Sequence, residues 1–215
     1  MTQVPKPFTR QDVSIETSKD SYSGFFRIRT YELQHALFKG GHSHLLKREL
    51  FERGEAVAVL LFDPDQQEVV LTEQFRIGAL DDERSPWLLE LVAGMIESGE
   101  SPESVAERET LEEAGCRYAE LVPICRYWVS PGGTNERIHL YCGLLDSSGV
   151  DGIHGLDDEG EDIRLVKLPL NEAFKLLDQG VINNAATIIA LQWLQLNLDR
   201  FIRDSAGSQT TGTES

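Results

Sequence analysis

Hydrophobic and polar residues alternate in the first quarter of the chain. Between residues 24 and 51 apolar side chains recur at alternate positions, as at Phe26 and Ile28, and Gly40-Gly41 interrupts the pattern. Alternation of this kind is typical of strands with one solvated face, and paired glycines favour a turn. We therefore expect a small antiparallel sheet here, separate from the main core. Residues 1–20 are polar and are expected to be mobile in part.

Longer apolar runs follow and predict the main sheet. Strands are expected at 55–62, 68–75, 121–130, 137–145 and 163–168, with a turn at 63–66 and an acidic, glycine-containing loop at 149–162, and the run at 87–92 leads into a glycine loop. Helical periodicity is expected at 170–179 and 183–203. In the second helix Asn183 or Asn184 can cap, and Ile188, Leu191 and Leu194 form an apolar stripe. Residues 204–215 lack apolar content and are expected to be disordered.

A helix with clustered carboxylates is expected after the glycine loop at 94–99. Ser101 is a suitable N-cap, Pro102 suits the first helical position, and Gly115 is a typical stop. The helix carries Glu109, Glu112 and Glu113, which fall within roughly 100° of arc because residues three and four apart share a face.

Two interpretations of these carboxylates are open. Arg108 is a local partner for Glu112, whereas Glu109 and Glu113 lack one and repel each other by roughly 0.2–0.5 kcal/mol. The glutamates alone favour a solvated acidic face. The opposite stripe of Ala106, Thr110 and Ala114, flanked by Leu111, would instead let the helix pack closely on a sheet and place the carboxylates beside the glycine loop, where they suit Mg²⁺ or Mn²⁺.

The spacing from Gly94 through Glu100 to Arg108-Glu109-x-x-Glu112-Glu113-x-Gly115 resembles the Nudix box. Thr110 and Cys116 depart from it, since aliphatic residues are usual there, but they remove no chemistry. The resemblance implies an α/β fold, the Nudix α/β/α sandwich with a mixed sheet, plus a small N-terminal antiparallel β subdomain. We expect that subdomain at 1–50, the hydrolase domain at 51–203 and a tail at 204–215.

Features outside the box resemble the branch of the family that cleaves ADP-ribose. Pro131 lies fifteen residues beyond Cys116, and the segments 48–53, 73–76, 87–94, 130–136 and 152–156 are similar to that branch. The resemblance implies Mg²⁺-dependent hydrolysis of ADP-ribose to AMP and ribose 5-phosphate. The alternatives are another nucleoside diphosphate sugar, such as GDP-mannose or another ADP-sugar, and a non-catalytic ADP-ribose sensor.

The resemblance also implies the roles of individual residues. Two or three Mg²⁺ ions, for which Mn²⁺ can substitute, would be held by Ala93, Glu109, Glu112, Glu113 and Glu161. Glu159 would be the general base and Glu112 would assist catalysis, although Glu159 and Glu161 are both open as the base. Arg108 would brace the glutamates. Substrate contacts would come from Phe25, Phe26, Arg48, Arg53, Arg76, Met95, Ser130, Gly132 and Glu136. At least one of the two phenylalanines is expected in the core if their segment is a strand.

The composition of the chain limits the binding partners and the cellular compartment that we expect for it. The net charge of −16 over 215 residues argues against nucleic acid, and no apolar run is long enough to span a membrane. Cys116, Cys125 and Cys142 lack metal-type spacing and are expected as buried thiols in a reducing cytoplasm. His42 and His44 are expected on the surface. A homodimer formed through the 24–51 sheet is expected, because that segment is too short to hold a core alone.

Overall fold

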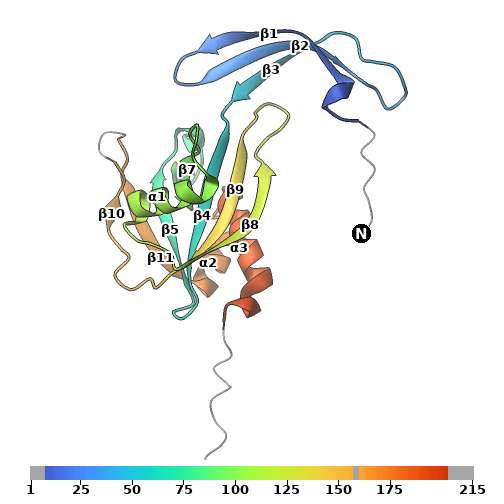
Figure 1. The fold of residues 1–215 in the computed structure, drawn as a ribbon. Helices are drawn as coiled ribbons and strands as arrows, with labels where there is room; N and C mark the ends of the chain where they lie inside the picture. Colours follow the sequence, from blue (N-terminus) through green and yellow to red (C-terminus); the bar gives the residue numbers. More distant parts are fainter. Residues whose placement is uncertain (1–7, 157–159, 203–215) are drawn as a thin grey trace, which may run out of the picture. The chain divides into compact units, whose positions relative to one another are not determined.

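The computed structural model describes residues 8–156 and 160–202 and divides the chain into two compact units (Figure 1). The first joins Met1–Glu55 with Trp128–Arg137, and the second joins Ala56–Tyr127 with Ile138–Ser215. The boundary expected at residue 50 falls within a strand of the first unit. Residues 128–137, expected in the hydrolase domain, group with that unit instead.

The first unit contains the predicted small antiparallel sheet. Its strands are β1 (Val13–Ser23), β2 (Arg27–His35) and β3 (Leu46–Glu52), in that order, preceded by a single turn η1 (Arg10–Asp12). Gly40 and Gly41 have φ of 90° and 76°, which confirms the turn. Strand β1 lies mostly in the segment expected to be polar and partly mobile. Its apolar pattern was too weak to predict it, because all but its first residue are exposed.

This small sheet has almost no interior. Among the described residues of the first unit only Thr30 and Ser43 are buried, and neither is apolar. A three-stranded sheet needs a hydrophobic face covered by another surface to be stable.

The second unit is built around a larger sheet. Its strands are β4 (Glu55–Asp63), β5 (Glu68–Phe75), β6 (Trp87–Glu90), β7 (Val92–Met95), β8 (Glu120–Trp128), β9 (Arg137–Leu144), β10 (Ile153–His154) and β11 (Ile163–Pro169). The described strands follow the order β10-β11-β5-β4-β9-β8, with β6 paired to β5 and β7 paired to β4. The sheet is mixed: β4 and β5 are antiparallel, whereas Arg137 N donates to Gly54 O and Leu145 N to Phe62 O, which aligns β9 parallel to β4.

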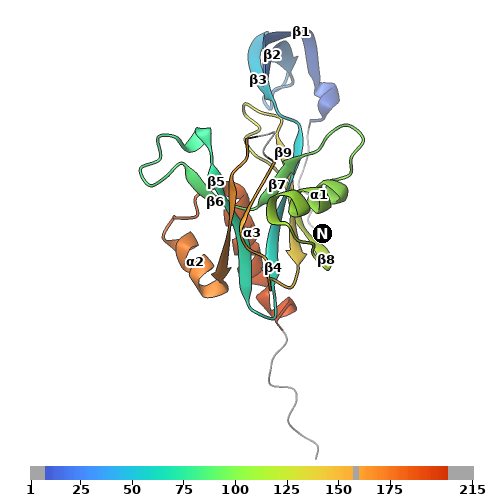
Figure 2. The same ribbon diagram turned by 90° about the vertical axis from the view of Figure 1, so that its left-hand side faces the viewer.

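Helices cover both faces of this sheet. They are α1 (Pro102–Ala114), α2 (Leu170–Asp178) and α3 (Ala185–Asn197), with short turns η2 (Ile77–Ala79) and η4 (Leu198–Arg200). Side chains alternate along each strand, so Val57 and Val59 pack in one cluster with α1, while Leu60 packs in another with α3. Figure 2 shows α1 on one face and α2 and α3 on the other, which confirms the α/β/α sandwich.

Several boundaries differ from those expected. The run at 87–92 forms two strands separated by Leu91, and the loop at 149–162 contains β10. The last helix ends at Asn197 and continues as η4, and its cap is Asn184, whose Oδ1 accepts from Thr187 N at 3.1 Å. The expected tail at 204–215 lies outside the described residues. None of the described helices is long and apolar enough to cross a membrane.

Candidate active site

The helix that carries the glutamates has the predicted ends. Ser101 Oγ accepts a hydrogen bond from Ser104 N at 3.1 Å, and Pro102 opens the helix. Gly115 ends it in the left-handed conformation with φ of 61°. Ala106, Thr110 and Ala114 are buried, so the small-residue stripe packs on the sheet as expected. Leu111, expected at its edge, is 46% exposed.

Gly94 lets α1 lie very close to β7. A Cβ atom at this position would stand 1.7 Å from Glu109 Oε1 and 2.0 Å from Glu109 Cδ. Any other residue would therefore displace the Glu109 carboxylate. Glycine is required here for its small size and not for its conformational freedom, because the Glu109 side chain lies directly against the Gly94 backbone.

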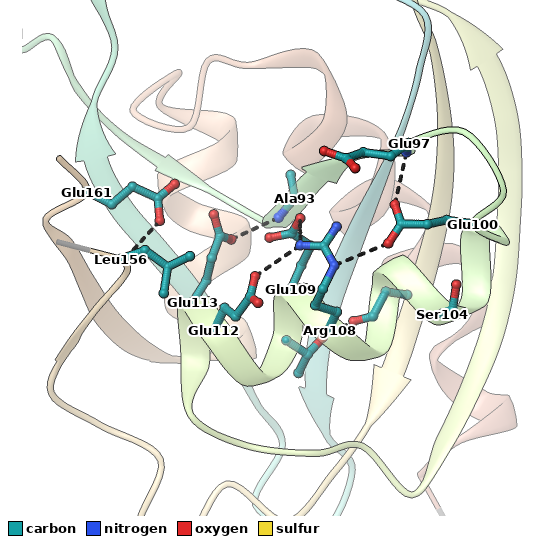
Figure 3. A network of polar contacts seen from close by, with 12 residues as sticks. Ala93, Glu97, Glu100, Ser104, Arg108, Glu109, Glu112, Glu113, Leu156 and Glu161 are labelled. Carbon is teal, nitrogen blue, oxygen red and sulfur yellow. Dashed lines mark hydrogen bonds and ion pairs between the residues drawn. The ribbon is translucent and has the colours of Figure 1, made fainter. Parts of the chain in front are cut away.

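Glu113 is a buried acid at the centre of the site (Figure 3). Its side chain is 3% exposed, and Oε2 accepts a hydrogen bond from Ala93 N on β7 at 2.9 Å. Burial raises the pKa of Glu113 to about 8, and the nearby charges of Glu109 and Glu161 act in the same direction, against the Ala93 hydrogen bond. A solvated acidic face, the alternative open from the sequence, does not describe this residue.

Glu109 shares one arginine with its neighbours. Arg108 Nη1 donates to Glu109 Oε1 at 2.8 Å and to Glu112 Oε2 at 3.0 Å, and its Nε lies 3.4 Å from Glu100 Oε1. The expectation that Glu109 lacks a local partner was therefore wrong. Burial nevertheless raises the pKa of Glu109 to about 7, with Arg108 opposing the shift. Arg108 thus braces three carboxylates at once.

Glu161 approaches the cluster from the other side (Figure 3). Its Oε2 accepts from Leu156 N at 3.1 Å, and its charge raises the pKa of both Glu109 and Glu113. The second candidate of this loop, Glu159, lies outside the described residues.

The donor chemistry of this cluster fits a hard divalent cation. Carboxylates driven toward protonation by burial and mutual repulsion are stabilised when a cation replaces the protons, and oxygen ligands are those that Mg²⁺ prefers. Within residues 8–156 and 160–202, however, no three acidic, histidine or cysteine side chains converge closely enough to form a closed metal cage. The cluster therefore contains oxygen donors suited to a divalent cation, but in the described part of the chain they do not surround a single point.

Arg76 and Met95 lie in the same unit. Arg76 Nε donates to Glu90 Oε2 at 2.6 Å, and the charge of Arg76 lowers the pKa of Glu113. Met95 ends β7 and is 37% exposed.

The remaining predicted substrate residues lie in the first unit, where an aromatic and arginine cluster forms. The Phe26 and Phe51 rings meet edge to face at 5.0 Å, and the Arg53 guanidinium lies 5.3 Å from the Phe26 ring. Phe25 is 94% exposed and Phe26 42% exposed. One of them was expected in the core if their segment were a strand, but the chain bends at residues 24–26 and β2 begins only at Arg27, so that condition is not met.

The segment between β8 and β9 folds against β3 in this unit. Glu136 Oε1 accepts from Arg53 Nε at 3.3 Å, and Ser130 O accepts from Gly133 N and Thr134 N. Asn135, which the sequence analysis missed, accepts from Arg53 N at 2.8 Å and therefore fixes the end of β3. No sequence signal marked it beyond its place beside Glu136.

Arg48 and Gly132 line a groove of about 490 Å³ in the first unit. Its other walls are Ile15, Tyr31, Leu33, Glu49, Leu50 and Pro131. Arg48 is exposed, and among the described residues its side chain donates only to the neighbouring Lys47 carbonyl, at 2.9 Å. Its guanidinium is therefore accessible to a ligand.

The cysteines and the histidine pair take no part in these clusters. All three thiols are free, but Cys125 is exposed, which corrects the expectation that all are buried. It faces solvent on β8, a strand with little buried surface. His42 and His44 are exposed, as expected.

Comparison with known proteins identifies the family. A family model described as NUDIX domain matches residues 52–191, more than half of the chain. The chain belongs to the Nudix family. The glycine loop and the carboxylate helix, whose spacing resembles the Nudix box, lie within the matched residues.

Curated relatives cover almost the whole sequence. The ADP-ribose pyrophosphatase of Escherichia coli (strain K12) is 49% identical over 194 residues, covering 90% of this chain and 93% of that protein. The ADP-ribose pyrophosphatase of Haemophilus influenzae is 47% identical over 193 residues, 88% of this chain and 89% of its own length. The GDP-mannose pyrophosphatase of Cronobacter sakazakii is 34% identical over 190 residues, covering 86% of this chain and 96% of that protein.

A solved structure has the same fold. The crystal structure of an ADP compounds hydrolase superposes with a TM-score of 0.64 and 21% identity, covering 88% of this chain and 98% of the other. The two chains therefore share a fold.

Proposed function

We propose that this Nudix enzyme hydrolyses the pyrophosphate of ADP-ribose to AMP and ribose 5-phosphate. The observation that carries the proposal is the pair of glutamates, the buried Glu113 and the partly buried Glu109, held against Ala93 and Gly94 of β7. Relatives named ADP-ribose pyrophosphatase, at 47–49% identity over most of their length, support the choice of substrate.

In this proposal Glu109, Glu113 and the Ala93 carbonyl hold divalent cations, with Glu112 and Glu161 contributing further ligands. The ions are two or three Mg²⁺, for which Mn²⁺ can substitute. When bound, they offset the charge of the diphosphate and lower the pKa of the attacking water. Arg108 keeps Glu109 and Glu112 in place, since it contacts both carboxylates.

The proton of the attacking water needs an acceptor. We assign this role to Glu159 on the strength of the family resemblance, with Glu161 as the rival. Glu161 already faces Glu109 and Glu113, which favours a metal-binding role for it.

Substrate binding uses arginines and exposed aromatic side chains. Arg76 carries positive charge beside the glutamates, and guanidinium groups pair well with phosphate oxygens. In the first unit we assign Arg48, Arg53, Phe25, Phe26, Ser130, Gly132 and Glu136 to the nucleotide and sugar. Exposed rings such as Phe25 can stack on a base.

The setting proposed for the enzyme is a homodimer in the cytoplasm. The described part of the first unit has no buried apolar core, which supports dimerisation, and the three free thiols are consistent with a reducing compartment. Neither nucleic acid nor a membrane is proposed as a partner, given the net charge of −16.

Hydrolysis of GDP-mannose is the second candidate. The GDP-mannose pyrophosphatase of Cronobacter sakazakii shares 34% identity with this chain, less than the ADP-ribose enzymes share. A non-catalytic ADP-ribose sensor is disfavoured, because Glu109, Glu112 and Glu113 are all present and Glu113 is buried at the centre of the cluster.

The decisive experiment is hydrolysis with Mg²⁺ of a substrate panel: ADP-ribose, GDP-mannose, another ADP-sugar and flavin adenine dinucleotide. Products are separated by chromatography. The highest kcat/KM is expected for ADP-ribose, with AMP and ribose 5-phosphate formed in equal amounts. A higher kcat/KM for GDP-mannose would replace the substrate assignment, and no turnover of any substrate would favour the sensor.

A further inference from the structure

An ion pair joins Arg76, just after β5, to Glu90 at the end of β6. Arg76 Nε donates to Glu90 Oε2 at 2.6 Å. The Glu90 side chain is 17% exposed and that of Arg76 is 44% exposed. The carboxylate is thus largely enclosed by protein, while the guanidinium remains open to solvent and to a ligand.

The register of the two strands shows that Arg76 is turned back over the sheet. Arg76 N donates to Pro86 O at 2.8 Å, whereas Glu90 lies four residues further along β6. The two side chains can meet only if both lean along the strands toward each other. Gln74 and Leu88 lie opposite each other between them on the same face. Gln74 is 7% exposed, which is consistent with a residue that the ion pair covers.

The ion pair lies on the face of the sheet that α1 covers. Val92, two residues after Glu90, packs in one apolar cluster with Ala106 of α1, and so does Val70, six residues before Arg76. Residues an even number apart share a face of a strand, and Arg76 is itself extended, with φ of −127° and ψ of 113°. Glu90 therefore directs the Arg76 guanidinium over the face on which the α1 glutamates lie.

Glu90 engages a single nitrogen of the guanidinium. Within residues 8–156 and 160–202, Nη1 and Nη2 of Arg76 donate no hydrogen bond. A guanidinium carries five N–H donors in a planar fork, and its terminal nitrogens suit a pair of phosphate oxygens. A carboxylate bound at Nε fixes the plane of this fork and leaves the terminal nitrogens for a ligand.

We propose that Glu90 is a positioning residue that holds the Arg76 guanidinium in the orientation that receives the diphosphate of the nucleotide sugar. The proposal rests on the proposed function, in which Arg76 contacts the diphosphate. Simple electrostatics predicts the opposite effect, because the negative charge of Glu90 repels an anionic substrate. Removing Glu90 should tighten substrate binding if its charge dominates and weaken binding if the orientation of Arg76 dominates.

The test compares Glu90→Met with Glu90→Gln in the full chain. Methionine removes the acceptor, whereas glutamine removes the charge but keeps an oxygen that can accept from Arg76 Nε. The dissociation constant of ADP-ribose is measured by calorimetry in EDTA, together with kcat and KM in Mg²⁺. Glu90→Met is expected to weaken binding and raise KM about 10–100-fold with little change in kcat, and Glu90→Gln should lie closer to the wild type.

Two further variants show whether Glu90 acts through the arginine. In an Arg76→Met background, Glu90→Met should weaken ADP-ribose binding no further, because the group that Glu90 positions is gone. Glu73→Gln is the matched control, since it breaks an ion pair of β5 on the other face of the sheet, where Arg164 Nε donates to Glu73 Oε2 at 2.7 Å. It should leave binding and KM unchanged.

Four outcomes would overturn the role of Glu90. Unchanged or tighter ADP-ribose binding in Glu90→Met would show that the orientation of Arg76 is not limiting. Equal losses in Glu90→Met and Glu90→Gln would assign the effect to charge. Additive losses with Arg76→Met would show that Glu90 acts elsewhere. A lowered melting temperature with unchanged binding would describe a purely structural ion pair.

Failure of the proposed function gives different results. If Arg76→Met keeps wild-type affinity and KM, the arginine does not contact the diphosphate, and the role of Glu90 falls with that assignment. A wild-type protein that neither binds nor hydrolyses ADP-ribose would refute the substrate itself. If GDP-mannose is the better substrate, the same variants are measured with it, because both molecules carry a diphosphate.

Discussion

Burial raises the pKa of the Glu113 and Glu109 carboxyl groups, so a divalent cation would compete with a proton at each of them. Both lie between α1 and β7, and burial raises their pKa values to about 8 and about 7. Each would give up its proton to a divalent ion near neutral pH. Mg²⁺ affinity should therefore rise steeply with pH across this range, because the ion competes with protons for the same oxygens.

Replacing Glu113 by glutamine should preserve the fold and abolish most turnover. The amide keeps the shape and can still accept from Ala93 N–H through its oxygen, while the charge that repels Glu109 is lost. The melting temperature should hold or rise, and hydrolysis of ADP-ribose should fall at saturating Mg²⁺. Wild-type rates in this variant would refute Glu113 as a ligand.

The same acid predicts the pH dependence of stability when metal is removed. The pKa of Glu113 is about 8 in the folded protein and 4.5 as its ordinary value, so between these pH values only the folded state keeps the proton. Stability in EDTA should therefore fall as pH rises from about 5 to 8, by at most about 1.4 kcal/mol per pH unit from this group. Thermal melts at several pH values check this.

Glu113→Gln is the control for that experiment, since it should flatten the slope and be more stable than the wild type at the upper end. Added Mg²⁺ should reverse the loss in the wild type. Parallel slopes for the two proteins would show that Glu113 does not set the dependence.

Kinetic measurements can distinguish the roles of two glutamates in the loop before β11. Glu159→Gln should lower kcat by roughly 10²–10⁴-fold with little change in KM, as expected for loss of a positioned general base. Extra Mg²⁺ should not restore it. The Glu161→Gln defect should ease at higher Mg²⁺, because Glu161 faces Glu109 and Glu113, the proposed metal ligands. Near-normal kcat in Glu159→Gln, with a metal-independent loss in Glu161→Gln, would reverse the assignment.

The contact between α1 and β7 depends on the two ends of the helix and on Gly94. The helix is fixed by its own caps at Ser101 and Gly115, and its distance from β7 is set by Gly94. The helix ends and the glycine together place Glu109 and Glu113 against the sheet.

Gly94→Ala should damage the site without unfolding the protein. The new methyl group meets the far end of the Glu109 side chain, which can rotate away, so the melting temperature should change little. A displaced carboxylate should lower kcat/KM about 10²-fold. Gly78→Ala is the matched control, because a Cβ there meets nothing within 4 Å. Full activity in Gly94→Ala would show that the close approach is dispensable.

The two units differ in how they are stabilised. The second unit has two apolar clusters, one on each face of its sheet, whereas the described part of the first unit buries no apolar side chain. Ile15, Tyr22, Phe38 and Leu45 of the first unit are all at least 40% exposed. Such a sheet gains stability chiefly from surfaces that other elements or chains supply.

The chain should therefore be a homodimer that depends on the first unit. Light scattering at micromolar concentration should give twice the mass of the chain. Deleting residues 1–50 should abolish dimerisation and ADP-ribose binding together. A fully active monomer would refute this arrangement.

The sequence by itself determined what depends on neighbours along the chain. The ends of α1 follow from Ser101 and Gly115, because a cap bonds to residues three or four positions away. Strands β4 and β5 were predictable because their apolar runs are bounded by turn residues. The box spacing likewise predicted which carboxylates share a helix face.

Tertiary structure alone decided the environment of those residues. Glu113 is buried where α1 packs on β7, and Ala93, twenty positions earlier, donates its N–H to the Glu113 carboxylate there. Glu161, from the loop before β11, raises the pKa of Glu113 through its charge. Burial and pKa are set by contacts between segments distant in sequence, and local patterns carry no information about which segments meet.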